Sequence, residues 1–168
     1  TLENVLPAQD DLAQIGVSDT VTSNVAQNAV TLISPNVEAL DSVLPSPPLW
    51  HENIVIFSDV RMDYQCTGCA PINVLKTESL ANALVRLYGA QSGGQIRQYN
   101  LASYSFTQLV ETLDNVESNF NDYLLANLQE AEWVVFNVLD NNTDYPASSA
   151  LVRILEERPD LLANKNVI

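Results

Sequence analysis

The chain has 168 residues, of which 21 are acidic and 7 are basic, giving a formal net charge of −14. This balance disfavours nucleic acids and anionic membranes as partners, because binding to either normally requires a basic surface that displaces counterions. Hydrophobic residues make up 46% of the chain, which indicates a globular fold. No apolar stretch reaches the roughly 18 to 20 residues needed to span a bilayer.

The first part of the chain reads as a connection into a larger domain. We expect residues 1–19 to be a linker or arm from a preceding domain. A helix should begin near Thr20, because apolar residues then recur every four positions, and a short strand should follow at 30–33. The proline-rich segment 44–48 favours an extended link. Residues 20–168 would then form the domain, which we expect to be cut from a longer polypeptide and truncated at its C-terminal end.

Two continuous apolar runs, at residues 54–57 and 133–136, are typical of strands covered on both faces, as in a parallel sheet. A weaker strand is expected at 96–99, and another should begin at 167–168. We expect these strands to alternate with helices along the chain, which predicts an α/β fold: a layered α/β/α sandwich with a mostly parallel sheet.

The helices between these strands have recognisable ends. Thr77 is a candidate N-cap, and Gly89 is a candidate stop for the same helix. The segment Ser105–Gln108 has the form of a capping box, and a further helical face follows over 120–128. Pro146 is suited to the first turn of a last helix, which Pro159 would end.

Polar residues directly follow the two most apolar strands. Asp59 and Arg61 follow the first, and Asp140 and Asn142 follow the second. Ligands of open α/β sheets bind beyond the carboxyl ends of the strands, and such side chains hydrogen-bond well to sugar hydroxyls. We therefore predict these four as substrate-binding residues. The alternative is that they stabilise solvated turns.

The pair Cys66 and Cys69 is the one compact chemical motif. It could be a local disulfide, half a zinc site or a redox pair. Zinc needs about four ligands and His51 is the only histidine, so we expect no metal site. In an exported protein, a disulfide that pins a surface loop is favoured, and free thiols are the alternative.

Several segments resemble glycoside hydrolase family 3, in particular its β-N-acetylhexosaminidase-like members. The similar segments are VAQNAVTLI at 25–33, ALVRLYG at 83–89, LASYSF at 101–106, WVVF at 133–136 and YPASSA at 145–150. The resemblance implies the second α/β sandwich domain, C-terminal to a catalytic barrel. In that family the catalytic Asp belongs to the barrel, so no catalytic residue and no cofactor are expected here.

The resemblance predicts an accessory domain that packs on the preceding barrel and contributes to a carbohydrate cleft. It also implies a bacterial enzyme that is extracellular or in the cell envelope. Two alternatives come from other classes. One is a free-standing small-ligand binding module of flavodoxin-like or periplasmic-receptor type, and the other is a thiol redox module that uses the two cysteines.

Overall fold

The computed structural model describes residues 19–30, 36–44, 46–115, 118–139 and 146–168. The chain divides into two compact units, Thr1–Ser46 and Pro47–Ile168. The described helices of the first unit are α2 (Asp19–Ala29) and α3 (Val37–Val43). Helix α2 confirms the helix predicted from Thr20. The arm up to residue 18 and positions 31–33 of the predicted strand lie outside the described residues.

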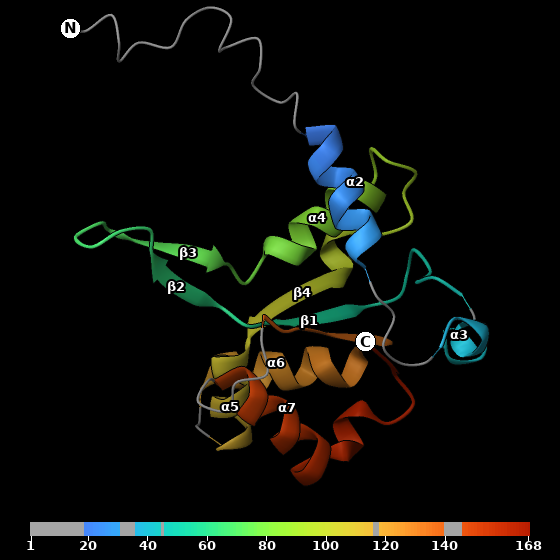
Figure 1. The fold of residues 1–168 in the computed structure, drawn as a ribbon. Helices are drawn as coiled ribbons and strands as arrows, with labels where there is room; N and C mark the ends of the chain where they lie inside the picture. Colours follow the sequence, from blue (N-terminus) through green and yellow to red (C-terminus); the bar gives the residue numbers. More distant parts are fainter. Residues whose placement is uncertain (1–18, 31–35, 45, 116–117, 140–145) are drawn as a thin grey trace, which may run out of the picture. The chain divides into compact units, whose positions relative to one another are not determined.

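The second unit is built on a four-stranded parallel sheet with the order β4-β1-β5-β6 (Figure 1). The strands are β1 (Ile54–Ser58), β4 (Leu101–Ser105), β5 (Trp133–Asn137) and β6 (Asn166–Val167). All five residues of β1 are buried, as expected for a strand with elements on both faces. The predicted α/β fold with a mostly parallel sheet is confirmed, and the two most apolar strands are its central neighbours.

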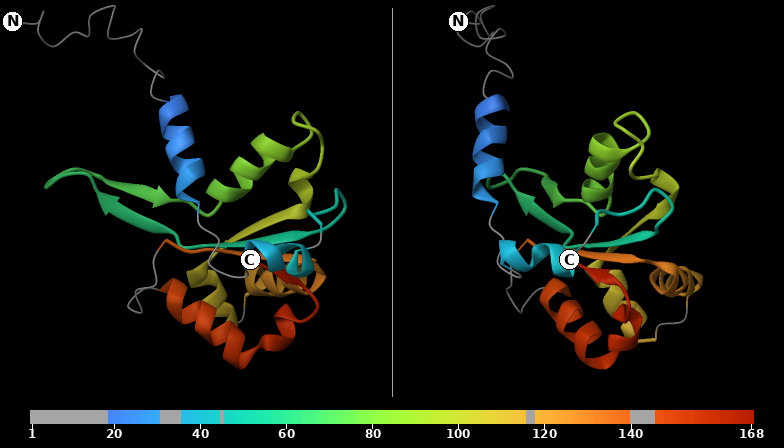
Figure 2. Two further views of the ribbon diagram at one scale, coloured as in Figure 1. Left: turned by 45° about the vertical axis from the view of Figure 1, so that its right-hand side comes forward. Right: turned by 90° about the vertical axis from the view of Figure 1, so that its right-hand side faces the viewer.

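Helices cover the two faces of the sheet unequally (Figure 2). Three helices, α5 (Phe106–Leu113), α6 (Asn119–Glu130) and α7 (Pro146–Glu157), lie on one face, and α4 (Ser79–Tyr88) lies on the other. The main core lies under the three helices and consists of Val55, Phe57, Tyr104, Phe106, Leu109, Leu124, Leu128, Ala131, Val134, Ala150, Ile154 and Leu161. No residue of α4 is fully buried, so the two layers differ in how firmly they are packed.

The strand predicted at 96–99 is wrong in position. Residues Gln98–Asn100 form a single 3-10 turn, and the strand β4 begins at Leu101. The reason is that a strand beside β1 must bury apolar side chains, as Tyr104 does. Arg97 cannot be buried in this way, and its guanidinium stacks instead on the ring of Trp50, 4.0 Å from the ring centroid.

The predicted helix ends are partly confirmed. At the start of α5, the Ser105 hydroxyl accepts a hydrogen bond from the Gln108 N–H at 3.2 Å, and the Gln108 side chain accepts the Ser105 N–H at 2.7 Å. The predicted N-cap Thr77 is wrong. The cap position of α4 is Glu78, which makes no side-chain capping bond. Helix α7 ends at Glu157, shortly before Pro159, as predicted.

Glycine is required at position 89, where α4 ends, because the backbone there leaves no room for a side chain. A Cβ atom at this position would lie 2.2 Å from the Val85 carbonyl oxygen, which accepts the Gly89 N–H at 2.8 Å. We expect Gly89→Ala to destabilise the fold by about 1 to 3 kcal/mol, the usual cost of overpacking. Urea denaturation checks this value, with the exposed neighbour Ala90→Ser as a control that should change stability by less than about 0.5 kcal/mol. Equal effects of the two changes would contradict the steric explanation.

Candidate functional site

The candidate site lies where β1 and β5 end, at the carboxyl edge of the sheet. Asp59 directly follows β1 and its side chain is only 4% exposed. Its Oδ1 accepts a hydrogen bond from Arg61 Nε at 3.0 Å, and its Oδ2 accepts one from Arg61 Nη2 at 2.5 Å. Oδ2 also accepts the backbone N–H of Leu139 at 3.3 Å. The carboxylate thus joins the guanidinium to the segment that follows β5.

This arrangement makes Asp59 a positioning group. Both of its oxygens accept hydrogen bonds, and the two bonds from the guanidinium fork fix the orientation of the carboxylate. A second bond, from the Asp59 N–H to the Asn137 carbonyl at 3.0 Å, ties the ends of β1 and β5 together. The Arg61 side chain, 17% exposed, is therefore held in one orientation beside the sheet edge.

A two-stranded antiparallel hairpin, which the sequence reasoning missed, carries Arg61. Its strands are β2 (Arg61–Tyr64) and β3 (Pro71–Leu75). A detectable signal was present, because apolar and polar residues alternate on both sides of the cysteine loop: Met62, Tyr64, Ile72 and Val74 are the apolar positions. All four of these side chains are exposed. An isolated two-stranded hairpin is marginally stable. Its exposed apolar side chains do not stabilise the fold, so their presence at the surface needs another explanation.

Between the hairpin and the end of β5 lies a hollow of about 460 Å³, lined by Val60, Arg61, Met62, Asp63, Val74 and Leu139. We call the four apolar residues of this lining, Val60, Met62, Val74 and Leu139, the edge patch. Each of them is exposed. The hollow therefore combines apolar walls with one oriented guanidinium and one carboxylate.

The four predicted binding residues stand as follows. Asp59 and Arg61 lie together at the sheet edge, in direct contact. Asp140 and Asn142 lie outside the described residues, so their role stays a prediction. The chain leading to them contacts Asp59 through Leu139. Because β1 and β5 are parallel neighbours, the expected placement of both strand ends on one edge is confirmed.

Cys66 and Cys69 lie in the loop that joins β2 and β3, and their sulfur atoms are at bonding distance, 2.03 Å. The loop is at the far end of the hairpin, which projects from the sheet edge (Figures 1 and 2). A thioredoxin-like pair is placed differently, since its thiolate is usually stabilised at a helix N-terminus. The geometry favours a disulfide that pins the loop.

We expect mass spectrometry of protein purified without reductant to find the Cys66–Cys69 bond and no alkylatable thiol. The closed loop is short, so chain entropy limits the stabilisation to about 2 kcal/mol at most. The double variant Cys66→Ser, Cys69→Ser should therefore remain folded, with a modest decrease in the free energy of unfolding. Two thiols that react in the folded, unreduced protein would exclude the bond.

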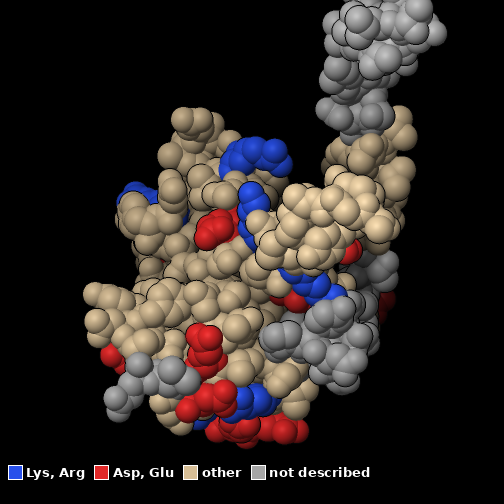
Figure 3. All heavy atoms as spheres, turned by 90° about the vertical axis from the view of Figure 1, so that its left-hand side faces the viewer, with Lys and Arg blue, Asp and Glu red and all other residues tan. Residues whose placement is uncertain are grey.

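Figure 3 views the chain from the side on which the hairpin projects. Most of this face is uncharged, with separate acidic and basic spots, and the acidic side chains gather at the lower end.

Where ion pairs form, they shift pKa values: hydrogen bonds from Arg153 lower the pKa of Glu157, and those from Arg158 lower the pKa of Asp160. Among the described residues, no cluster of three potential metal-ligating side chains occurs. No described helix is long and apolar enough to cross a membrane.

Comparison with known proteins identified no matching family model, no matching curated protein and no matching solved structure. The resemblance to glycoside hydrolase family 3 therefore stays a prediction from the segments quoted above. The fold and the geometry of the sheet edge are the observations on which a function can be argued.

Proposed function

We propose that this chain is a non-catalytic accessory domain of a family 3 glycoside hydrolase that acts on β-linked sugars such as N-acetylglucosaminides. In this proposal the carboxyl edge of the sheet packs on the catalytic barrel of the same polypeptide and lies beside its sugar cleft. The parent protein would be exported by a bacterium, and the local disulfide is compatible with an oxidising compartment.

The observation that carries the proposal is the edge patch with Arg61 beside it. Contiguous exposed apolar side chains that a fold leaves uncovered are characteristic of interaction surfaces. Arg, Met and Tyr are among the residue types enriched in protein interfaces, and Arg61, Met62 and Tyr64 all lie on β2. Asp59 holds the Arg61 guanidinium in a fixed orientation at this surface.

The proposed role of Asp59 also supports an accessory function. Retaining glycoside hydrolysis requires two carboxyl groups about 5 to 5.5 Å apart that are available to the substrate. Asp59 is buried and bound to Arg61 and Leu139, so it is poorly placed to act as a nucleophile or an acid. The geometry thus favours a role in shaping the edge over a role in bond cleavage.

A pair of matched variants tests the interface. Val74 in the edge patch and Val152 on α7 have nearly equal exposure, 53% and 52%. In the complete polypeptide, Val74→Asp should weaken docking of the sandwich on the barrel and lower glycosidase activity about tenfold or more, because a buried unpaired carboxylate is costly. Val152→Asp should leave activity unchanged. Equal activities of the two variants would remove the edge patch as the interface.

The isolated chain should hydrolyse neither aryl N-acetylglucosaminides nor aryl glucosides above the background rate. The reason is that catalysis would depend on residues of the barrel. A colorimetric assay with both substrates checks this expectation. Turnover that disappears in Asp59→Asn or Asp140→Asn would show that the chain itself carries catalytic carboxylates and would overturn the proposed function.

A further inference from the structure

A second cluster lies at the opposite, amino edge of the sheet. Arg97 and Tyr99 precede β4, and Trp50 precedes β1. The Arg97 guanidinium stacks on Trp50, 4.0 Å from the ring centroid, and lies 5.6 Å from the ring centroid of Tyr99. Its Nη1 also donates a hydrogen bond to the Tyr99 hydroxyl. The guanidinium is thus held by an aromatic ring and by a hydroxyl.

The charge of Arg97 is not neutralised by a neighbouring side chain. Within the described part of the chain, no carboxylate forms an ion pair with Arg97 or with Arg86, whereas Arg61, Arg153 and Arg158 each have at least one. Tyr99 is 74% exposed, although its hydroxyl accepts a hydrogen bond from Arg97. An oriented cation next to an exposed ring is suited to a ligand.

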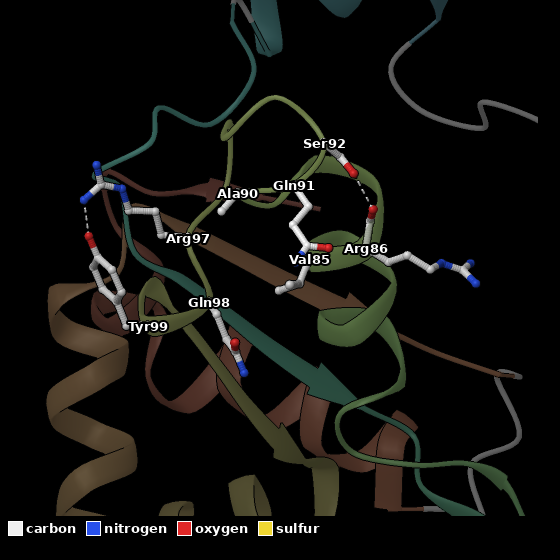
Figure 4. A pocket seen from close by; sticks show the side chains of 8 residues that line it. All are labelled: Val85, Arg86, Ala90, Gln91, Ser92, Arg97, Gln98 and Tyr99. Atoms are coloured by element: carbon white, nitrogen blue, oxygen red, sulfur yellow. Dashed lines mark hydrogen bonds between the residues drawn. The ribbon is translucent and has the colours of Figure 1, made fainter.

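Arg97 and Tyr99 line a hollow of about 680 Å³. The other residues of its lining are Val85, Arg86, Ala90, Gln91, Ser92 and Gln98. None of the lining residues is acidic. Figure 4 shows the side chains of Gln91 and Gln98 in the middle of this group. The Arg97 guanidinium lies at one side, directed outward to the Tyr99 hydroxyl, and the Arg86 guanidinium is directed outward at the other side. The amides can donate and accept hydrogen bonds.

We propose that this hollow is a binding site for a small acidic ligand, in which Arg97 binds the carboxylate and Tyr99 stacks on the ligand's ring. A uronic acid sugar is the class that fits both features. Guanidinium groups bind carboxylates with charge-assisted, often bidentate hydrogen bonds, and an exposed tyrosine presents a flat apolar surface at low entropic cost. This site is separate from the carboxyl edge and does not depend on the proposed accessory function.

Titration of the full chain with D-glucuronate tests the site. Trp50 is exposed and Trp133 is nearly buried, so changes in tryptophan fluorescence report mainly on Trp50. The titration should be done in 0.15 M salt, where repulsion by the distant negative charges is screened beyond about 8 Å. We expect saturable binding with a Kd on the order of 1 mM, confirmed by calorimetry. Glucose, which has the ring without the carboxylate, should bind at least about tenfold more weakly, since it cannot form the charge-assisted bonds.

Two arginine variants give a matched comparison. Arg97→Gln should weaken glucuronate binding about tenfold or more, since charge-assisted bonds are lost. Arg86→Gln should change it less than about twofold, because that guanidinium lies at the opposite side of the hollow from Arg97 and Tyr99. Thermal unfolding checks that both variants fold. Equal effects of the two variants, equal binding of glucose and glucuronate, or no saturable binding would overturn the proposal. Acetate has the carboxylate without the ring. If acetate binds more weakly than glucuronate and its binding depends on Arg97, both the carboxylate contact and the ring contact are supported. Acetate binding as tight as that of glucuronate would overturn the ring contact.

Discussion

Arg61→Met should destabilise the sandwich by about 2 to 3 kcal/mol in urea denaturation. Methionine keeps the aliphatic length of arginine but removes both hydrogen bonds to Asp59, whose carboxylate is 4% exposed. Leaving one member of a buried ion pair without its partner typically costs about 3 to 5 kcal/mol. The expected value is lower here because the Arg61 side chain is 17% exposed and water can partly replace it.

A double-mutant cycle separates the ion pair from general packing. Asp59→Leu combined with Arg61→Met replaces both charges, so the double variant should be more stable than the sum of the single effects predicts, with a coupling energy of at least about 1 kcal/mol. Additive effects would mean that the two side chains do not stabilise one another. The Asp59–Arg61 ion pair would then not be what stabilises the carboxyl edge of the sheet.

Phe57→Ala should be still more damaging and cost about 3 to 5 kcal/mol, the usual range for removing a large aromatic side chain from a core. Phe57 is completely buried, and its ring centroid lies 5.6, 5.9 and 6.4 Å from those of Phe136, Tyr104 and Phe106. It therefore joins β1 to β4, β5 and α5. A domain of this size has a total stability of about 5 to 15 kcal/mol, so this change removes a large fraction of it.

Phe120→Ala is the matched control. Phe120 is an aromatic residue of the same unit; its ring packs edge-on against that of Tyr104, and it is 43% exposed. Its loss should cost about 1 to 2 kcal/mol, because the folded protein leaves 43% of the residue in contact with water. The two variants are compared by the denaturant midpoint. Similar midpoints would show that the core is not centred on Phe57.

The sequence predicted the centre of the sheet well and its margins less well. The segments at 54–57 and 133–136 are apolar at every position, and both became central strands because only a central parallel strand buries both of its faces. The capping box at Ser105 was equally informative, since its hydrogen bonds are local in the sequence. Strand order was not predictable, because it depends on contacts between distant segments.

The errors have specific physical causes. The sequence predicts a weak strand at 96–99, whereas Gln98 belongs to a 3-10 turn and the strand starts three residues after it, at Leu101. The hairpin around Cys66 was interpreted as a loop because its apolar side chains alternate but are not buried. At the candidate site, the sequence placed Asp59 and Arg61 correctly beyond β1. The ion pair between them could not be predicted, because side chains two residues apart can either contact each other or point in different directions.

The most direct test of the accessory-domain account is the sequence of the native polypeptide on the N-terminal side of Thr1, determined from the intact purified protein by mass spectrometry and peptide mapping. The account predicts a (β/α)-barrel of about 250 residues before Thr1 in the same chain. A mature protein whose export signal is cleaved immediately before Thr1, with no barrel in the polypeptide, would contradict it and favour a free-standing binding module.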